Sequence, residues 1–284
     1  MTDGQKKNIL KAFHLLGMFF KVAKRDGLFV SAKRARETFT REMTTVSHGA
    51  NKKTSETCEF FVPDIKLKLK NYIQTENIQA IHHLGRYEWA VRVIENIPHK
   101  KILDIACGSG FGSHMIASHF SSSDVIGVDY DQRAVDMAKN RYDLTNLKYA
   151  KGNIVTWKFE DGCLGKFDVI VSFDTIEHLL HREIALKNIV NNLSDSGLLL
   201  ISTPCGHSES LLNPGWEHHK IEYSNSDLYD LLKRYFKNVY RADDDNLPAL
   251  DYWKDVINKD RIRYDNRMNP LVCSGPILIR NDGR

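Results

Sequence analysis

The stretch Lys101-Ile-Leu-Asp-Ile-Ala-Cys-Gly-Ser-Gly-Phe-Gly112 decides the fold of this chain. A short apolar run leads into three glycines, and residues 115–120 beyond them have the composition of a helix. Apolar runs typical of strands follow at 124–129, 147–153, 167–173 and 198–203. They alternate with helical patterns at 134–141 and 184–193. Strands that are apolar along their whole length are typical of a parallel sheet covered on both faces. The sequence therefore predicts a doubly wound α/β fold with a mostly parallel sheet.

The flanks of this alternating region extend the same pattern. Residues 78–97 have helical spacing, and Ser224 is a candidate N-cap for a helix over 224–235. Two further apolar runs, at 236–241 and 277–280, are predicted to close the sheet. The connection between them includes residues 244–271, and a connection of that length inside a domain is usually functional. We therefore expect 244–271 to form a substrate-side insertion.

Basic residues are concentrated in the first quarter of the chain. Residues 1–75 hold 15 lysines and arginines against 7 acidic residues, although the formal net charge of the whole chain is only +4. Because residues 9–23 repeat apolar side chains at helical spacing, we predict a basic helical extension or lid over 1–75 and a main domain over 76–284. The helix is suited to packing on the main domain or to forming a homo-oligomer. The charge fits either a solvated helix face or an anionic partner.

The overall composition is that of an ordinary globular protein. Hydrophobic residues make up 42% of the chain and charged residues 27%, which excludes a collagen-like, disulfide-scaffold or wholly disordered chain. The five cysteines form no Cys-x-x-Cys pair, so the sequence indicates neither a disulfide framework nor a zinc knuckle. We expect a cytoplasmic protein. No apolar run is long enough to predict a transmembrane helix.

The glycine turn and the acids near it indicate a nucleoside ligand. Glycines at alternate positions, 108, 110 and 112, let the backbone turn sharply and approach a ligand closely. Asp129 ends the next apolar run, where an acid binds ribose hydroxyls in a nucleotide-binding βαβ unit. Asp104 precedes the turn, and its carboxylate could accept hydrogen bonds from a cationic amino group. The pattern favours a nucleoside that carries an amino acid.

Several motifs in this order resemble those of the class I S-adenosylmethionine-dependent methyltransferases. The motifs are the segments 102–112, 128–129, 152–153, 167–171 and 197–204. The resemblance covers roughly residues 80 to 240 and implies a Rossmann-like sheet of seven strands whose last strand is antiparallel. It also implies S-adenosylmethionine as cofactor, bound along the carboxyl ends of the first four strands.

The family resemblance assigns cofactor contacts position by position. Asp104 and the turn Gly108, Ser109 and Gly110 would meet the methionine moiety, and Asp129 would meet the ribose. Asn153 would contact the adenine edge, with Tyr130 and Phe173 close to the adenosine. In relatives resembling quinone O-methyltransferases an arginine upstream of the first strand holds the methionine carboxylate, and here Arg86 is the candidate.

The candidate catalytic residues follow the fourth and fifth predicted strands. Methyl transfer from a sulfonium requires an aligned nucleophile and, for a hydroxyl, removal of a proton. His178 or His219 is predicted to be the general base, with Glu177 beside it, although either histidine could instead be structural. The segment 174–178 is similar to an acid-and-histidine box in quinone and small-RNA O-methyltransferases. That resemblance implies a divalent-metal set of Asp174, Glu177, His178 and His219, but we expect no resident metal.

The sequence leaves several functions open. We expect an O-methyltransferase acting on a sugar, a glycan precursor or another small metabolite. The basic N-terminal segment and the acid-and-histidine box would also suit an RNA 2′-O-methyltransferase with a divalent metal, although no RNA-binding module is recognised and a nucleic-acid partner is not expected. A third possibility is an inactive scaffold subunit that binds the cofactor, which turnover would distinguish.

Overall fold

The computed structural model describes residues 60–64, 69–74, 78–95, 97–160, 162, 165–204, 218–242, 247 and 270–277. All of them belong to the second of the two units into which the chain divides, Phe60–Arg284. The predicted helix at 9–23 and most of the 244–271 insertion lie outside the described residues. The division at residue 75, the lid and the homo-oligomer therefore stay predictions.

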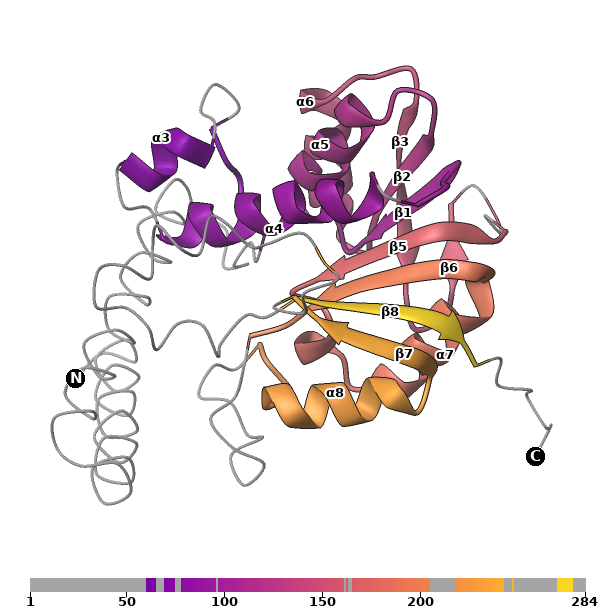
Figure 1. Cartoon of the computed structure of the whole chain (residues 1–284). Helices are drawn as coiled ribbons and strands as arrows, with labels where there is room; N and C mark the ends of the chain where they lie inside the picture. Colours follow the sequence, from indigo (N-terminus) through magenta and orange to yellow (C-terminus); the bar gives the residue numbers. More distant parts are fainter. Residues whose placement is uncertain are drawn as a thin grey trace, which may run out of the picture. The chain divides into compact units, whose positions relative to one another are not determined.

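A single sheet forms the centre of this unit (Figure 1). Its strand order is β4-β3-β2-β1-β5-β6-β8-β7. The parallel strands are β1 (Lys101–Ile105), β2 (Asp124–Asp129), β3 (Leu147–Asn153), β5 (Phe167–Phe173) and β6 (Leu193–Ser202). Strand β8 (Leu271–Pro276) runs antiparallel to β6 and to β7 (Phe236–Arg241). The predicted doubly wound α/β fold is confirmed.

Two expectations about the sheet are wrong. The described sheet has eight strands rather than seven, because β4 (Lys158–Phe159) folds back antiparallel onto the end of β3. The closing strand is Leu271–Pro276 instead of residues 277–280, and Ile277 follows its end. The apolar run Leu271-Val-Cys273 forms the closing strand because it pairs with β6 and β7 and is almost fully buried between them. Pro270 and Gly275-Pro276 flank the run and make it look like a loop in the sequence.

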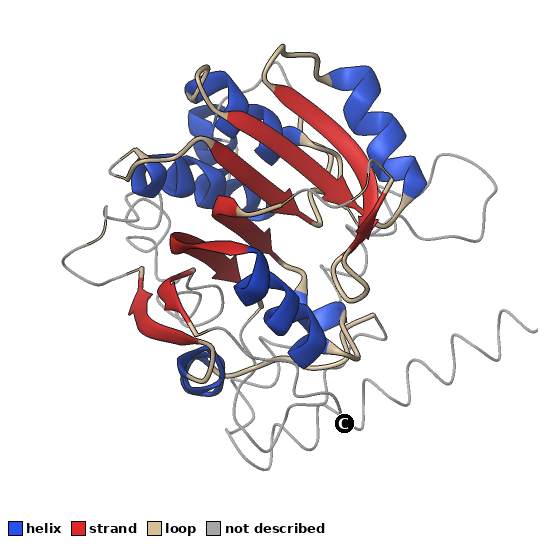
Figure 2. Ribbon diagram, turned by 90° about the vertical axis from the view of Figure 1, so that its right-hand side faces the viewer, coloured by secondary structure: helices blue, strands red, loops and turns tan. Residues whose placement is uncertain are grey.

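Helices cover both faces of the sheet (Figure 2). Side chains of α4 (Ile78–Ile94), α5 (Phe111–His119) and α6 (Gln132–Arg141) pack into one hydrophobic core, which Tyr72 of the short helix α3 (Leu69–Gln74) also joins. Helices α7 (Arg182–Asn192) and α8 (Asn225–Lys233) pack into a second core on the opposite face. Among the described helices, none has the length and apolar character needed to cross a membrane.

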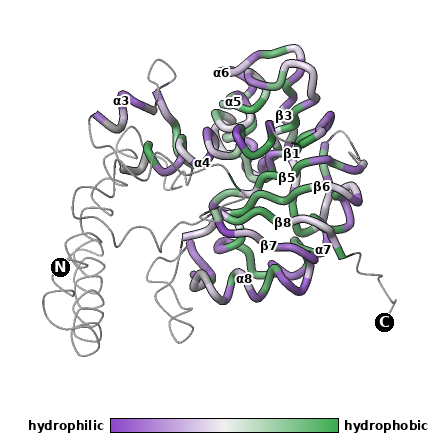
Figure 3. Tube along the Cα trace, in the orientation of Figure 1, coloured by the Kyte–Doolittle hydropathy of each residue, from purple (hydrophilic) through white to green (hydrophobic). Residues whose placement is uncertain are grey.

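The central strands are hydrophobic along their length, whereas hydrophobic and hydrophilic residues alternate along the covering helices (Figure 3). Ile102 on β1 contributes to one core and its neighbour Leu103 to the other, and neither side chain has exposed surface. Successive strand residues point to opposite faces, so a strand covered on both sides is apolar throughout. Ser224 caps α8 as predicted, since its side chain accepts a hydrogen bond from the Asp227 amide. The parallel strands bring their carboxyl ends to one edge, where the candidate site lies.

Candidate cofactor and acceptor site

The glycine turn connects β1 to α5 and has a backbone that favours glycine. Gly108 and Gly110 have φ values of +54° and +82°, in the left-handed region that side chains disfavour. A Cβ at Gly110 would lie 2.5 Å from Cβ of Ala138 in α6, and one at Gly112 would lie 2.0 Å from the Tyr87 ring. The glycines are therefore required by close protein neighbours and by the turn itself.

Asp104 lies beneath this turn with no exposed surface. The Tyr87 hydroxyl donates to both of its oxygens, at 3.0 and 3.2 Å, and Ser113 Oγ donates to Oδ2 at 2.6 Å. Burial raises the pKa of Asp104 to about 6, and the hydrogen bonds from Ser113 and Tyr87 limit the rise. Neither Tyr87 nor Ser113 belongs to the glycine motif, so their contacts with Asp104 could not be predicted from the sequence.

Asp129 ties the end of β2 to the glycine turn. Its Oδ2 accepts a hydrogen bond from the Gly108 amide at 2.9 Å, and its Oδ1 accepts one from the Asp131 amide at 2.9 Å. Burial raises the pKa of this carboxyl group, and the backbone donors oppose the rise. The structure therefore brings Asp129 and the glycine turn together, as the motif predicts, while the following Tyr130 is 72% exposed.

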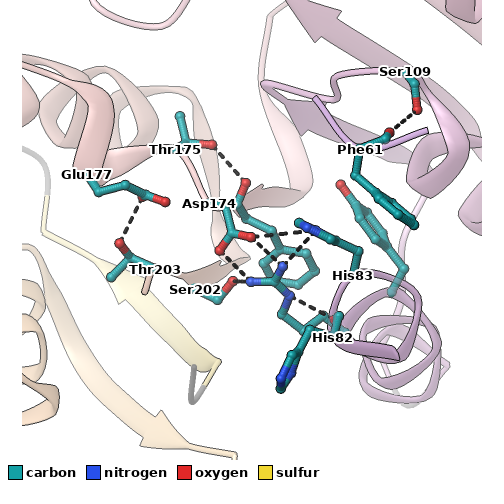
Figure 4. A network of polar contacts seen from close by, with 12 residues as sticks. Phe61, His82, His83, Ser109, Asp174, Thr175, Glu177, Ser202 and Thr203 are labelled. Carbon is teal, nitrogen blue, oxygen red and sulfur yellow. Dashed lines mark hydrogen bonds and ion pairs between the residues drawn. The ribbon is translucent and has the colours of Figure 1, made fainter. Parts of the chain in front are cut away.

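Arg86 is buried on α4, and its guanidinium is engaged by protein acceptors. Figure 4 labels the partners Asp174, Ser202, His82 and His83. The two terminal nitrogens donate to the two oxygens of Asp174, which forms a bidentate ion pair. Further hydrogen bonds join Nη1 to Ser202 Oγ at 3.0 Å and Nε to the His82 carbonyl at 3.1 Å, and Nη2 lies 3.0 Å from His83 Nδ1. A methionine carboxylate would have to replace one of these partners.

Asp174 itself has an unusual backbone. It follows β5 directly with φ +49°, a left-handed value that is uncommon for a residue other than glycine. Burial acts to raise the pKa of its carboxyl group, but the adjacent Arg86 guanidinium outweighs this effect and the pKa is lowered overall. The carboxylate is therefore ionised and directed toward α4.

A short segment of the chain, residues 60–64, lies against the glycine turn. Ser109 Oγ donates to the Phe61 carbonyl at 2.6 Å, and the Phe61 ring stacks on His83 with centroids 4.8 Å apart (Figure 4). Arg141 Nη2 donates to the Pro63 carbonyl at 3.0 Å. The hydroxyl of the predicted cofactor residue Ser109 is thus hydrogen-bonded to this segment. Nothing in the sequence predicted that residues 60–64 contact the glycine turn.

Two other predicted cofactor residues have protein partners. The Asn153 side chain accepts hydrogen bonds from the amides of Val155 and Thr156, at 2.8 and 3.2 Å, and so stabilises the turn after β3. Phe173 is 6% exposed and makes an edge contact with Tyr87, with centroids 5.1 Å apart. Their contacts with adenosine stay predictions.

Glu177 lies in the short 3₁₀ helix η1 (Ile176–His178) that follows β5, and it is completely buried. Its Oε2 accepts a hydrogen bond from Thr203 Oγ1 at 2.8 Å (Figure 4), whereas Oε1 has no hydrogen-bond partner among the described residues. Burial raises the pKa of Glu177 well above its usual value, and the negative charge of Asp174 raises it further. A buried carboxyl oxygen without a partner is costly and requires a physical reason.

The predicted catalytic histidines lie close to Glu177 and to each other. The Glu177 carbonyl accepts hydrogen bonds from the amides of Lys220 and Ile221, which holds the segment containing His219 beside the loop. The rings of His178 and His219 meet edge to face, with centroids 4.8 Å apart. Burial and the neighbouring His219 lower the pKa of His178 to about 4. The structure brings together all three residues predicted to be catalytic.

Comparison with known proteins identifies the family. Residues 97–263 match the model of the methyltransferase domain. The chain belongs to this family. The match includes the glycine turn, Asp129 and the segment with Glu177, so the class I resemblance is confirmed, and S-adenosylmethionine is the cofactor.

Individual relatives of this methyltransferase domain are distant. The chain is 34% identical over 105 residues to the "Probable S-adenosylmethionine-dependent methyltransferase Rv3030" of Mycobacterium tuberculosis, a match that covers 37% of this chain and 36% of that relative. It is 28% identical over 194 residues to a malonyl-[acyl-carrier protein] O-methyltransferase of Bacillus cereus, covering 63% and 71% of the two chains. A solved Haloferax volcanii methyltransferase complex with the Trm112 activator shares the fold, with a TM-score of 0.51 and 15% identity over 75% of this chain and 97% of that one.

Proposed function

We propose that this chain transfers the methyl group of S-adenosylmethionine to an oxygen atom of a small molecule. The observation that carries the proposal is the cluster of Glu177, His178 and His219 at the carboxyl edge of the sheet. Polar side chains buried there suit activation of a hydroxyl or carboxyl oxygen. The names of two relatives, the malonyl-[acyl-carrier protein] and tocopherol O-methyltransferases, support an oxygen acceptor.

Hydrogen bonds at Nδ1 indicate which nitrogen of each histidine carries the proton. The Nδ1 atoms of His178 and His219 lie 3.2 Å from the His218 carbonyl and 2.6 Å from Glu222 Oε1. Because these oxygens accept hydrogen bonds, the proton of each ring belongs on Nδ1 and the lone pair on Nε2. An imidazole nitrogen in this form can take a proton from an acceptor hydroxyl while the methyl group is transferred. We propose a sugar, a glycan precursor or another small metabolite as the acceptor.

Replacement of Asp129 by alanine tests the cofactor half of this proposal. The variant loses a charged acceptor for the ribose and the hydrogen bond to Gly108. We expect binding of S-adenosylmethionine to weaken by about 1.5 to 3 kcal/mol, roughly 10- to 150-fold in Kd, as measured by calorimetry. Asp131→Ala is the matched control, because it removes the carboxylate that caps α6 and should leave Kd nearly unchanged. A parent chain that binds no S-adenosylmethionine contradicts the proposed function.

Cofactor affinity should also depend on pH through Asp104. The cationic amino group of the cofactor favours the ionised carboxylate, and the pKa of Asp104 is raised to about 6 by burial. The carboxylate is ionised at pH 7.5 and largely protonated at pH 5, so Kd should increase by about tenfold on acidification. In Asp104→Asn the affinity should be lower at pH 7.5 and nearly independent of pH. An equal pH dependence in parent and variant would assign the effect to another group.

A further inference from the structure

We infer that Arg86 does not bind the carboxylate of the cofactor and is instead a positioning residue for the acceptor side of the site. It holds residues 174–178, here called the acceptor segment, which follow β5 and include Glu177. This inference rests on the proposed function, which places the methyl acceptor beside Glu177. It replaces the role that the family resemblance implies for Arg86.

Every N–H group of the Arg86 guanidinium has an acceptor within the described part of the chain. A guanidinium has five such groups and no acceptor atom of its own. Nε donates to the His82 carbonyl at 3.1 Å. Nη1 donates to Asp174 Oδ1 and, at 3.0 Å, to Ser202 Oγ. Nη2 donates to Asp174 Oδ2 and, at 3.0 Å, to His83 Nδ1. A cofactor carboxylate could therefore gain a hydrogen bond from Arg86 only by displacing an acceptor that is already in place.

Exchange of Asp174 for a cofactor carboxylate would leave an uncompensated charge. The side chain of Arg86 is 1% exposed and that of Asp174 is 19% exposed. The negative charge of Asp174 raises the pKa of the completely buried Glu177, and the Arg86 guanidinium opposes this rise. A carboxylate that loses its cation in such surroundings is costly. We therefore expect the ion pair between Arg86 and Asp174 to persist when the cofactor is bound.

Arg86 connects helix α4 to the ends of two strands. Asp174 directly follows β5, and Ser202 is the last residue of β6. The Asp174 amide donates to the Ser202 carbonyl at 3.0 Å, so the two residues that accept from Nη1 are also bonded to each other. The next residue, Thr203, donates to Glu177 Oε2 at 2.8 Å (Figure 4). Arg86 therefore fixes both backbone positions on which the Glu177 carboxyl group depends.

The backbone of Asp174 explains why the acceptor segment needs this restraint. Its φ of +49° lies in the left-handed region, which costs a residue other than glycine roughly 1 to 2 kcal/mol. This residue turns the chain from β5 toward η1. A residue in an unfavourable backbone conformation persists only where its surroundings hold it there. The bidentate contact with Arg86 and the amide bond to Ser202 provide that restraint.

Decarboxylated S-adenosylmethionine tests whether Arg86 contacts the cofactor carboxylate, because it differs from the cofactor only in lacking that group. Calorimetry gives the dissociation constants of both compounds for the full parent chain and for the double variant Arg86→Met and Asp174→Asn, in which no unpaired charge remains. We expect the ratio of the two constants to stay within about threefold of the parent ratio. If Arg86 held the carboxylate, the preference for the cofactor would fall by about tenfold or more.

Asp174→Asn alone tests whether Asp174 competes with the cofactor for Arg86. Asparagine tolerates the left-handed backbone of this position and can still accept a hydrogen bond from Arg86. The dissociation constant for S-adenosylmethionine should stay within about threefold of the parent value. A competing carboxylate would give the opposite result, because its removal would make the cofactor bind about tenfold more tightly or better.

Hydrogen exchange measures the positioning role itself. The amides of His178, Leu179 and Lys220 donate to carbonyls of the acceptor segment. In the double variant these amides should exchange about tenfold faster or more, whereas the amides of helix α6 should exchange nearly as in the parent chain. Arg92→Met is the matched control, since this half-buried arginine lies on the same helix α4, and it should change neither set. Circular dichroism confirms that each variant is folded.

Three outcomes overturn the inference. They are loss of the preference for the carboxylate-bearing cofactor in the double variant, tighter cofactor binding in Asp174→Asn, and equal acceleration of exchange in the acceptor segment and in α6. A parent chain that binds neither compound overturns the proposed function instead, and the exchange experiment then still tests which segment Arg86 holds.

Discussion

Replacing Arg86 by methionine should lower the free energy of unfolding by about 3 to 5 kcal/mol, the usual result of removing one partner from a buried ion pair. The substitution leaves the ionised Asp174 without its guanidinium partner and removes donors from Ser202 and the His82 carbonyl. Methionine occupies a similar volume, so lost packing contributes little. Urea denaturation followed by circular dichroism measures the change.

Two further variants identify the cause of this loss. In the double variant Arg86→Met and Asp174→Asn no unpaired charge remains, so much of the lost stability should return. Arg92→Met is the matched control on the same helix, α4, where the side chain is half-buried, and it should cost less than about 1 kcal/mol. A double variant as unstable as Arg86→Met would show that packing, not the uncompensated carboxylate, sets the cost.

Replacing Gly110 by alanine should destabilise the protein by roughly 2 to 5 kcal/mol, and it should also weaken cofactor binding. The φ value of +82° costs an alanine about 1 to 2 kcal/mol. The added Cβ would lie 2.5 Å from Cβ of Ala138 and 2.8 Å from the Tyr149 ring. Because Ala138 is part of helix α6, the clash is relieved only by moving that helix, and such overpacking costs about 1 to 3 kcal/mol.

Gly162→Ala separates the backbone effect from the clash. Gly162 has a similar φ, +88°, but no described atom lies within 4 Å of its added Cβ. This variant should lose only the backbone contribution of about 1 to 2 kcal/mol. The two variants are compared by urea denaturation. Equal losses at Gly110 and Gly162 would contradict a packing role for the turn.

Local signals in the sequence were sufficient for most of the fold. Continuous apolar runs predicted β1, β2, β5 and β6 because a parallel strand buried on both faces needs apolar residues throughout. Strands β3 and β7 were also predicted, although exposed residues interrupt the buried ones in both. The strand Leu271–Pro276 was missed, since its burial depends on pairing with β6 and β7. Pro270 precedes it, and Gly275 and Pro276 are its last two residues. Helix α4 ends at Ile94, three residues before the predicted end.

The candidate site could likewise be predicted from the sequence only in part. The motif was sufficient to place Asp129 beside Gly108, because consecutive parallel strands end at the same edge. The roles of Tyr87, Thr203 and Glu222 could not be predicted, since each depends on a side-chain contact that spacing does not encode. The resemblance implied that Arg86 binds the methionine carboxylate of the cofactor. In the structure Arg86 instead forms an ion pair with the carboxylate of Asp174.

The sequence by itself determined the alternation of strands and helices, the glycine turn and the class of cofactor, because periodicity, backbone freedom and motif spacing are properties of neighbouring residues. Only the tertiary structure decided which charges meet. Arg86 and Asp174 are 88 residues apart, and His219 reaches Glu177 because the returning chain pairs with the Glu177 carbonyl. Such pairings depend on strand order, which sets which side chains lie close together. Because a buried charge without a partner is costly, each charge pairs with the group that the fold places beside it.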